Sequence, residues 1–173
     1  MSNIDSKNTK YEISEALIGL IREARNYSEI NISSVAFKAN MHRNTIYYHF
    51  RDMKELLLWT VHYELNKAMT SREYFDVRDG MAVFFTRMRP LLLFAKQEMG
   101  TEEYLRNLRF EILPLVEPLT EGPAINSEEA KKIAVDTFVE QIVVASLIHE
   151  KPADMIRLIF TSIMPEVLRR PLI

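Results

Sequence analysis

The spacing of apolar residues constrains this chain most, because they recur every three or four positions through almost all of its 173 residues. That spacing matches the period of about 3.6 residues of an amphipathic α-helix, and runs with the two-residue period of a half-buried strand are absent. Only 4 glycines interrupt the pattern. The sequence therefore predicts an all-α protein, and a hydrophobic content of 47% is enough to build a sizeable core.

The N-terminal part opens with two predicted helices. The first spans about residues 7–27 and carries one apolar stripe, formed by Ile13, Leu17, Leu20, Ile21 and Ala24. A short second helix follows Asn31, whose side chain can accept hydrogen bonds from the first free backbone N–H groups. Asn40 is placed to end that helix, because asparagine tolerates left-handed backbone better than most residues.

Two further helices complete this part of the chain. A third helix is predicted over residues 43–49, after a turn of about three residues. A fourth begins near Asp52, which has capping-box spacing to Glu55, and continues to about Met69. We therefore expect one domain over residues 1–52 and a second over 53–173, linked through the helix of residues 52–70.

Longer helices are predicted in the rest of the chain. Glycine and proline supply the breaks at Gly100, between Pro114 and Pro123, and at Lys151-Pro152, and Asn126 has capping-box spacing to Glu129. The expected helices span about residues 77–98, 101–113, 126–149 and 153–169.

Residues 32–49 have the proportions of a helix-turn-helix, in which a short second helix lies against a DNA duplex. The side chains expected to pack on the first helix are Val35, Ala36, Ala39, Met41, Ile46 and Phe50. Those left outside carry hydrogen-bonding groups, namely Arg43, Asn44, Thr45, Tyr48 and part of His49. Arg43 can fork onto guanine and Asn44 onto adenine, whereas Thr45 and the tyrosine hydroxyls can reach bases or phosphates.

A purely structural role for the same segment remains an alternative, in which tyrosines and histidine sit at the edge of an ordinary three-helix core. Tyr47 is half-buried by its spacing, so packing and phosphate contact through its hydroxyl both remain open. The same holds for His49.

The sequence of residues 30–57, INISSVAFKANMHRNTIYYHFRDMKELL, resembles the signature of the tetracycline-repressor (TetR) family. The matching residues are Thr45, Ile46, Tyr47, His49, Phe50, Glu55 and Leu56. The resemblance implies a dimeric, all-helical regulator whose variable C-terminal domain binds a small ligand. The DNA-contacting set expected on both grounds is Arg43, Asn44, Thr45, Tyr47, Tyr48, His49 and Lys54.

Three positions depart from the family pattern. Asn40 stands where the family usually has glycine, His42 where it has serine or threonine, and Met53 where it has a phosphate-binding lysine. His42 is a poorer helix cap than serine. Lys54, or the N-terminus of the fourth helix, is expected to replace the lysine missing at position 53.

The helices predicted in the C-terminal half carry more apolar residues than packing within a single subunit would bury. Residues 133–148 carry two apolar stripes, and one face of a helix cannot bury both. We therefore expect a homodimer through a bundle of four helices at a two-fold axis. The predicted interface consists of Phe138, Ile142, Val143, Leu147, Ile156, Ile159, Phe160 and Ile163.

Large apolar residues of this half could also line a ligand pocket inside a helical bundle. The pocket residues predicted are Phe85, Met88, Phe110 and Phe138. The same side chains could equally fill a core, so both readings stay open. The expected ligand is a small apolar or amphipathic effector.

Several classes of function are disfavoured. The chain has no cysteine, and neither His62 nor His149 stands at a recognisable metal spacing, so we expect no metal site and no cofactor. No phosphate loop or catalytic motif is recognisable, which argues against an enzyme. A polar start, and no run of about 18 apolar residues, predict a cytoplasmic protein with no membrane partner.

Together these features predict a homodimeric transcription regulator that binds double-stranded operator DNA and is controlled by a small-molecule effector, most simply as a repressor. Control by a protein partner instead of a small ligand is the alternative.

Overall fold

Helix α1 (Asn3–Glu23) begins the chain in this computed structural model, which describes residues 3–70, 77–116, 128–148 and 152–162. Within these ranges every regular element is a helix, so the predicted all-α class is confirmed. In the same ranges no helix is long and apolar enough to cross a membrane. The chain divides into two compact units. Unit 1 comprises residues 1–61 and 90–100, and unit 2 comprises residues 62–89 and 101–173.

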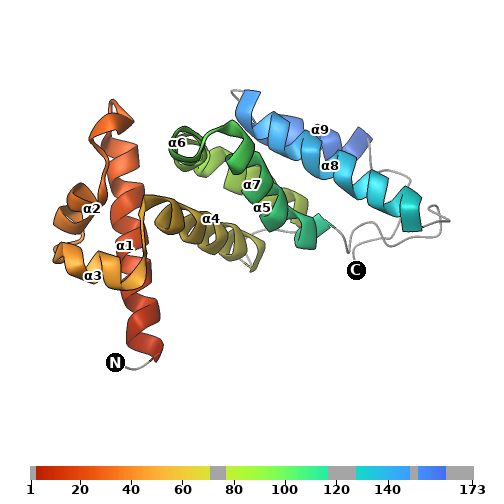
Figure 1. Ribbon diagram of the computed structural model, residues 1–173. Helices are drawn as coiled ribbons and strands as arrows, with labels where there is room; N and C mark the ends of the chain where they lie inside the picture. The colour runs from red at the N-terminus through yellow and green to blue at the C-terminus, as the bar shows by residue number, and fades with distance from the viewer. Residues whose placement is uncertain (1–2, 71–76, 117–127, 149–151, 163–173) are drawn as a thin grey trace. The chain divides into compact units, whose positions relative to one another are not determined.

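Unit 1 is built on α1. Its other elements are the 3₁₀-helix η1 (Tyr27–Glu29), α2 (Ile32–Lys38), α3 (Arg43–His49), the first half of α4 (Met53–Thr70) and most of α6 (Arg89–Met99). Helices α2 and α3 both pack on α1 (Figure 1). The core is formed by Ile13, Leu17, Ile21, Val35, Ala36, Ile46, Phe50 and Leu56. Most of the stripe predicted on the first helix is therefore buried.

Helix α1 begins and ends earlier than the predicted range of residues 7–27. Asn26 has extended backbone, and its side-chain oxygen accepts a hydrogen bond from the Ser28 N–H at 3.0 Å. This local bond starts η1 and competes with continuation of α1, as asparagine side chains often do. A buried hydrogen bond of 3.1 Å from the Ser14 hydroxyl to the Thr60 hydroxyl joins α1 to α4.

Unit 2 contains the second half of α4, α5 (Val77–Arg87), α7 (Thr101–Val116), α8 (Glu128–Ile148) and α9 (Pro152–Ser162). Helix α8 lies beside both α7 and α9, and α9 also packs on α5 (Figure 1). Two ion pairs join these helices at the surface, between Arg109 of α7 and Asp136 of α8 and between Arg157 of α9 and Asp79 of α5. The buried core of this unit includes Phe84, Phe85, Ile112, Phe138, Ile142 and Ile156.

The single helix predicted over residues 77–98 is wrong, because the chain forms two helices there, α5 and α6. The Met88 N–H still bonds to the Phe84 carbonyl at 2.8 Å, and a new helix starts at Arg89. Pro90 explains the break, because proline has no N–H to donate and disfavours helical backbone in the residue before it. It is tolerated in the first turn of α6, where no donor is required.

The other long helices predicted from the sequence are present, but their first and last residues differ from the prediction. Helix α7 continues past Pro114 to Val116, where an end at residue 113 was predicted. Helix α8 starts at Glu128, and its predicted cap Asn126 lies outside the described residues. Helix α9 is described to Ser162, and the remainder of the range predicted to residue 169 lies outside the description.

Candidate nucleic-acid interface

Helix α2 starts at a reciprocal cap. The Asn31 side-chain oxygen accepts hydrogen bonds from the backbone N–H groups of Ser33 at 2.9 Å and Ser34 at 3.1 Å. In return, the Asn31 N–H donates to the Ser34 hydroxyl oxygen at 2.9 Å. The predicted cap is confirmed, and such an arrangement contributes about 1 kcal/mol to helix stability.

The turn between α2 and α3 is a Schellman motif. The Met41 N–H donates to the Ala36 carbonyl at 2.9 Å, and the Asn40 N–H donates to the Phe37 carbonyl at 3.1 Å. Asn40 has a φ of 53°, the left-handed conformation that the sequence predicted. The turn therefore reverses the chain within three residues and brings α3 directly after α2.

Helix α3 spans the predicted residues and is capped by a side chain that usually caps poorly. The His42 Nδ1 accepts a hydrogen bond of 3.2 Å from the Asn44 N–H. Ile46 and Phe50 are buried, with 0% and 1% of their surface exposed, so the inner face of α3 is apolar as predicted.

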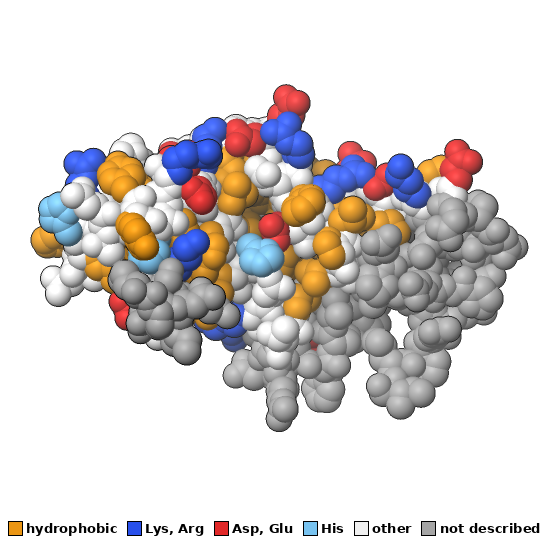
Figure 2. All heavy atoms as spheres, turned by 60° about the horizontal axis from the view of Figure 1, so that its bottom comes forward, with side chains coloured by type: hydrophobic (Ala, Val, Ile, Leu, Met, Phe, Trp, Pro, Cys, Tyr) orange, Lys and Arg blue, Asp and Glu red, His pale blue; other side chains and the backbone are white. Residues whose placement is uncertain are grey.

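The outer face of α3 carries the predicted polar and aromatic groups. Arg43 and Asn44 are exposed, Tyr47 is 46% exposed, and Tyr48 is 71% exposed, whereas Thr45 is half-buried. Figure 2 shows hydrophobic, histidine and basic side chains exposed together over the α2–α3 end of unit 1. A short helix with this surface can offer donors, acceptors and ring faces to a nucleic acid.

His49 was expected to be partly exposed, and it is buried instead. Only 7% of its surface is accessible, and its Nε2 has no hydrogen-bond partner among the described residues. Burial lowers the pKa of His49 below 6.5, and the nearby Lys10 ammonium lowers it further. The ring is therefore neutral at pH 7, and a direct ionic contact with phosphate is disfavoured.

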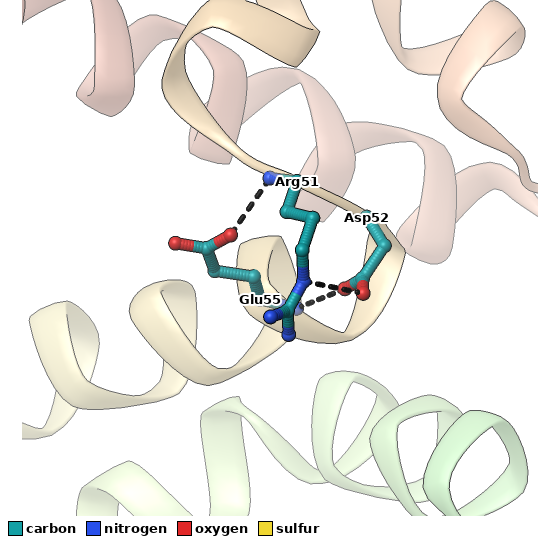
Figure 3. Close-up of polar contacts among 3 residues, drawn as sticks. All are labelled: Arg51, Asp52 and Glu55. Atoms are coloured by element: carbon teal, nitrogen blue, oxygen red, sulfur yellow. Dashed lines mark hydrogen bonds and ion pairs between the residues drawn. The ribbon is translucent and has the colours of Figure 1, made fainter.

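The turn into α4 is held by three residues (Figure 3). The Glu55 N–H donates to Asp52 Oδ1 at 2.9 Å, the Arg51 N–H donates to Glu55 Oε2 at 2.7 Å, and the Arg51 Nε donates to Asp52 Oδ2 at 3.2 Å. The hydrogen bond from the Glu55 N–H is the main cause that lowers the pKa of Asp52. Lys54 lies half-buried in the same first turn of α4. This network fixes where α4 begins relative to the end of α3.

The residues predicted for the dimer interface lie mainly inside unit 2. Phe138, Ile142, Val143, Ile156 and Ile159 each expose 6% or less of their surface within the single chain. They pack within their own subunit and expose almost no surface there, and their contact with a second copy stays a prediction. The placement of the Leu147 and Phe160 side chains and of Ile163 lies outside the description.

Other apolar side chains of α8 and α9 are exposed, and none of them was predicted as a contact residue. Ile133 is 61% exposed, Val144 39%, Ile148 69%, and Leu158 of α9 54%. The first three share one face of α8, because Val144 lies about three helical turns after Ile133, and Ile148 lies about one turn after Val144. Their exposure follows from the packing of α8 on α7 and α9, which the spacing of apolar residues in the sequence does not show.

The four predicted pocket residues do not share one environment. Phe85 and Phe138 are fully buried, Met88 is half-buried, and Phe110 is 75% exposed. Phe110 therefore cannot line an enclosed cavity with the other two rings. Among the described residues, no three His, Asp or Glu side chains are placed to hold a metal ion.

No protein-family model matches the chain, and neither does any curated protein. The fold of the chain is nevertheless similar to that of a solved structure. A solved structure that it matches is the dihydroxyacetone kinase operon activator DhaS, with a TM-score of 0.69 over 92% of this chain and 96% of that chain. DhaS is a TetR-family regulator, and the two sequences are 13% identical. The resemblance seen in residues 30–57 is therefore confirmed at the level of the fold.

Proposed function

We propose that this protein is a homodimeric transcription regulator whose helix α3 enters the major groove of operator DNA. The outer face of α3 carries the proposal, because Arg43, Asn44, Tyr47 and Tyr48 are exposed there while Ile46 and Phe50 fix the helix on α1. The fold shared with DhaS supports the same class of function. In this proposal residues 1–52 bind DNA and residues 53–173 provide dimerisation and control.

The face of α8 with Ile133, Val144 and Ile148, together with Leu158 of α9, is the proposed dimer contact. Exposed apolar side chains gathered on neighbouring helices are typical of subunit interfaces. A two-fold axis through this face would pair two copies of the chain. The residues predicted earlier, such as Phe138 and Ile142, then support the contact from beneath.

A binding selection with the whole protein tests the proposal. Duplexes enriched from a random library should contain a palindrome whose half-sites lie about one helical turn, or roughly 34–36 Å, apart. Recovery of no common sequence, with binding equal to that of random duplex, would refute sequence-specific regulation.

The finer parts of the proposal are repression and control by a small apolar or amphipathic effector among Phe85, Met88 and Phe138 of unit 2. The mechanism is a population shift, in which the effector prefers the state with the lower DNA affinity. Repression predicts that deleting the gene raises transcription from the selected promoter, and a fall would identify an activator, as DhaS is by its name.

Anilinonaphthalene sulfonate is a suitable amphipathic probe for the effector site. It should bind the native dimer saturably, and Met88→Lys should abolish the fluorescence rise. A signal that never saturates, or one unchanged in Met88→Lys, would contradict the proposed effector site.

A further inference from the structure

An open groove of about 420 Å³ lies beside the recognition helix α3, entirely within unit 1. Its walls come from the start of α2, one side of α3, the first residue of α4 and the end of α6. The lining residues are Ile30, Asn31, Ile32, Ser33, Arg43, Tyr47, Met53 and Glu98. Arg43 is the basic residue of this lining, and Glu98 is the acidic one.

The Arg43 side chain extends along α3 and is held by Tyr47. Its Nη2 donates a hydrogen bond to the Tyr47 hydroxyl at 3.3 Å, and its guanidinium carbon lies 5.8 Å from the centre of the Tyr47 ring. Residues four apart share one face of a helix, so this contact directs Arg43 toward the next turn of α3. In the part of the chain that the structure describes, no carboxylate lies within ion-pair distance of the guanidinium.

The exposed surface of α3 therefore has two rows. Arg43 and Tyr47 form the row that lines the groove, and Asn44 and Tyr48 form a second row about 100° further around the helix. Base edges are read by side chains that project from the helix into the major groove, whereas backbone phosphates are contacted at its flanks. The two rows are suited to these two tasks.

We infer that Arg43, positioned by Tyr47, binds a DNA backbone phosphate at this groove, while the row of Asn44 and Tyr48 reads the bases. A guanidinium matches a phosphate in charge and in the geometry of its donors. Ser33 of α2 also lines the groove, and Met53 provides an apolar side without a competing polar group. The inference rests on the proposed function and assigns separate tasks within that interface.

The Glu98 carboxylate on α6 sets a limit on this phosphate site. Its negative charge opposes a phosphate in the same groove, and it is exposed, so solvent screens the repulsion. Replacing Glu98 by Gln should therefore raise the affinity for every duplex modestly and equally. No change on this substitution would contradict a phosphate in the groove.

Binding of the whole protein to its selected operator and to a scrambled duplex of equal length, at several salt concentrations, tests the inference. Arg43→Ala should weaken both complexes by the same factor, at least about tenfold, because a charge-assisted contact to the phosphate is lost. The salt slope should fall by about one ion. Asn44→Ala is the matched control, which should lower the preference for the operator and leave the slope unchanged.

Two further variants separate a phosphate contact from a structural role. Met53→Lys places a new cation in the same groove, so in the Arg43→Ala background it should restore the salt slope and most of the affinity for both duplexes. Tyr47→Phe keeps the ring and removes the hydroxyl, and its effect should be smaller in the Arg43→Ala background than in the native protein. Circular dichroism and sedimentation should show that each variant remains folded and dimeric.

Loss of operator affinity in Arg43→Ala, with the scrambled complex and the salt slope unchanged, would overturn the inference and make Arg43 a base reader. Equal affinity of native protein and Arg43→Ala for both duplexes would also overturn it. Failure of the native protein to bind any duplex would instead refute the proposed function itself.

Discussion

The recognition helix α3 and the long helix α8 differ in how far their sequences define their surfaces. In α3 the apolar residues Ile46 and Phe50 face inward, and the polar and aromatic residues around them are exposed as their spacing predicted. In α8 apolar residues occupy more than one stripe, and Phe138, Ile142 and Val143, which were predicted to contact a second subunit, are buried within the single chain. When a helix has one apolar face, the sequence predicts which side is buried. When it has two, the sequence predicts only that each face has a packing partner.

The largest expected effect distinguishes two phenylalanines that the sequence placed together. Phe138→Ala should lower the free energy of unfolding by about 3–5 kcal/mol, because the ring is fully buried and its removal leaves a cavity. Phe110→Ala, at a 75% exposed position, should change it by less than about 0.5 kcal/mol. Urea unfolding at equal protein concentration measures both, and equal losses would show that Phe110 has a buried partner in the dimer.

A charge on the outer stripe of α8 tests which surface forms the dimer. Val144→Asp should raise the dissociation constant of the dimer at least tenfold, because a carboxylate would be desolvated in an apolar contact at a cost of more than about 1.4 kcal/mol. Lys132→Glu, an exposed change elsewhere on α8, is the control and should leave it unchanged. Analytical ultracentrifugation measures the dissociation constants of both variants. If Val144→Asp stays as dimeric as the native protein, the interface lies elsewhere.

Loss of the helix cap at the start of α4 should lower the free energy of unfolding by a smaller amount. Asp52→Ala should cost about 1 kcal/mol of stability, whereas Arg51→Ala removes only an exposed ion pair and should cost less. Because the folded-state pKa of Asp52 is lowered from 3.8, its contribution is complete above about pH 3.8 and is lost as the pH falls through the folded value. Asp52→Ala should therefore flatten this part of the stability profile, and an unchanged acid slope would contradict the assignment.

Titration of His49 should have the smallest effect on the free energy of unfolding, and this effect should appear at a higher pH than that of Asp52. Its folded-state pKa lies below 6.5, so the unfolded chain takes up a proton first as the pH falls, and stability decreases below about pH 6.5. His49→Gln cannot titrate and should remove this decrease. Lys10→Gln should reduce it in part, since burial is the larger cause. Parallel profiles of native protein and His49→Gln between pH 7 and 5 would refute a lowered pKa.

How much of the molecule could be predicted differs between local and long-range features. The cap at Asn31, the left-handed Asn40 and the ends of α3 were predicted because each depends on a few adjacent residues. The break between α5 and α6 also has a local signal, Pro90, which the helical spacing of apolar residues over 77–98 does not reveal. The burial of His49, the exposure of Phe110 and the groove beside Arg43 could not be predicted, because they depend on contacts between residues distant in the chain.

The operator affinity of a triple variant, Arg43→Ala with Asn44→Ala and Tyr48→Ala, tests the central claim most directly. All three side chains are exposed, so the variant should remain folded and dimeric by circular dichroism and sedimentation. A mobility-shift titration should then show operator binding no tighter than binding to random duplex. A folded, dimeric triple variant with the operator affinity of the native protein would contradict the assignment of α3 as the DNA-reading helix.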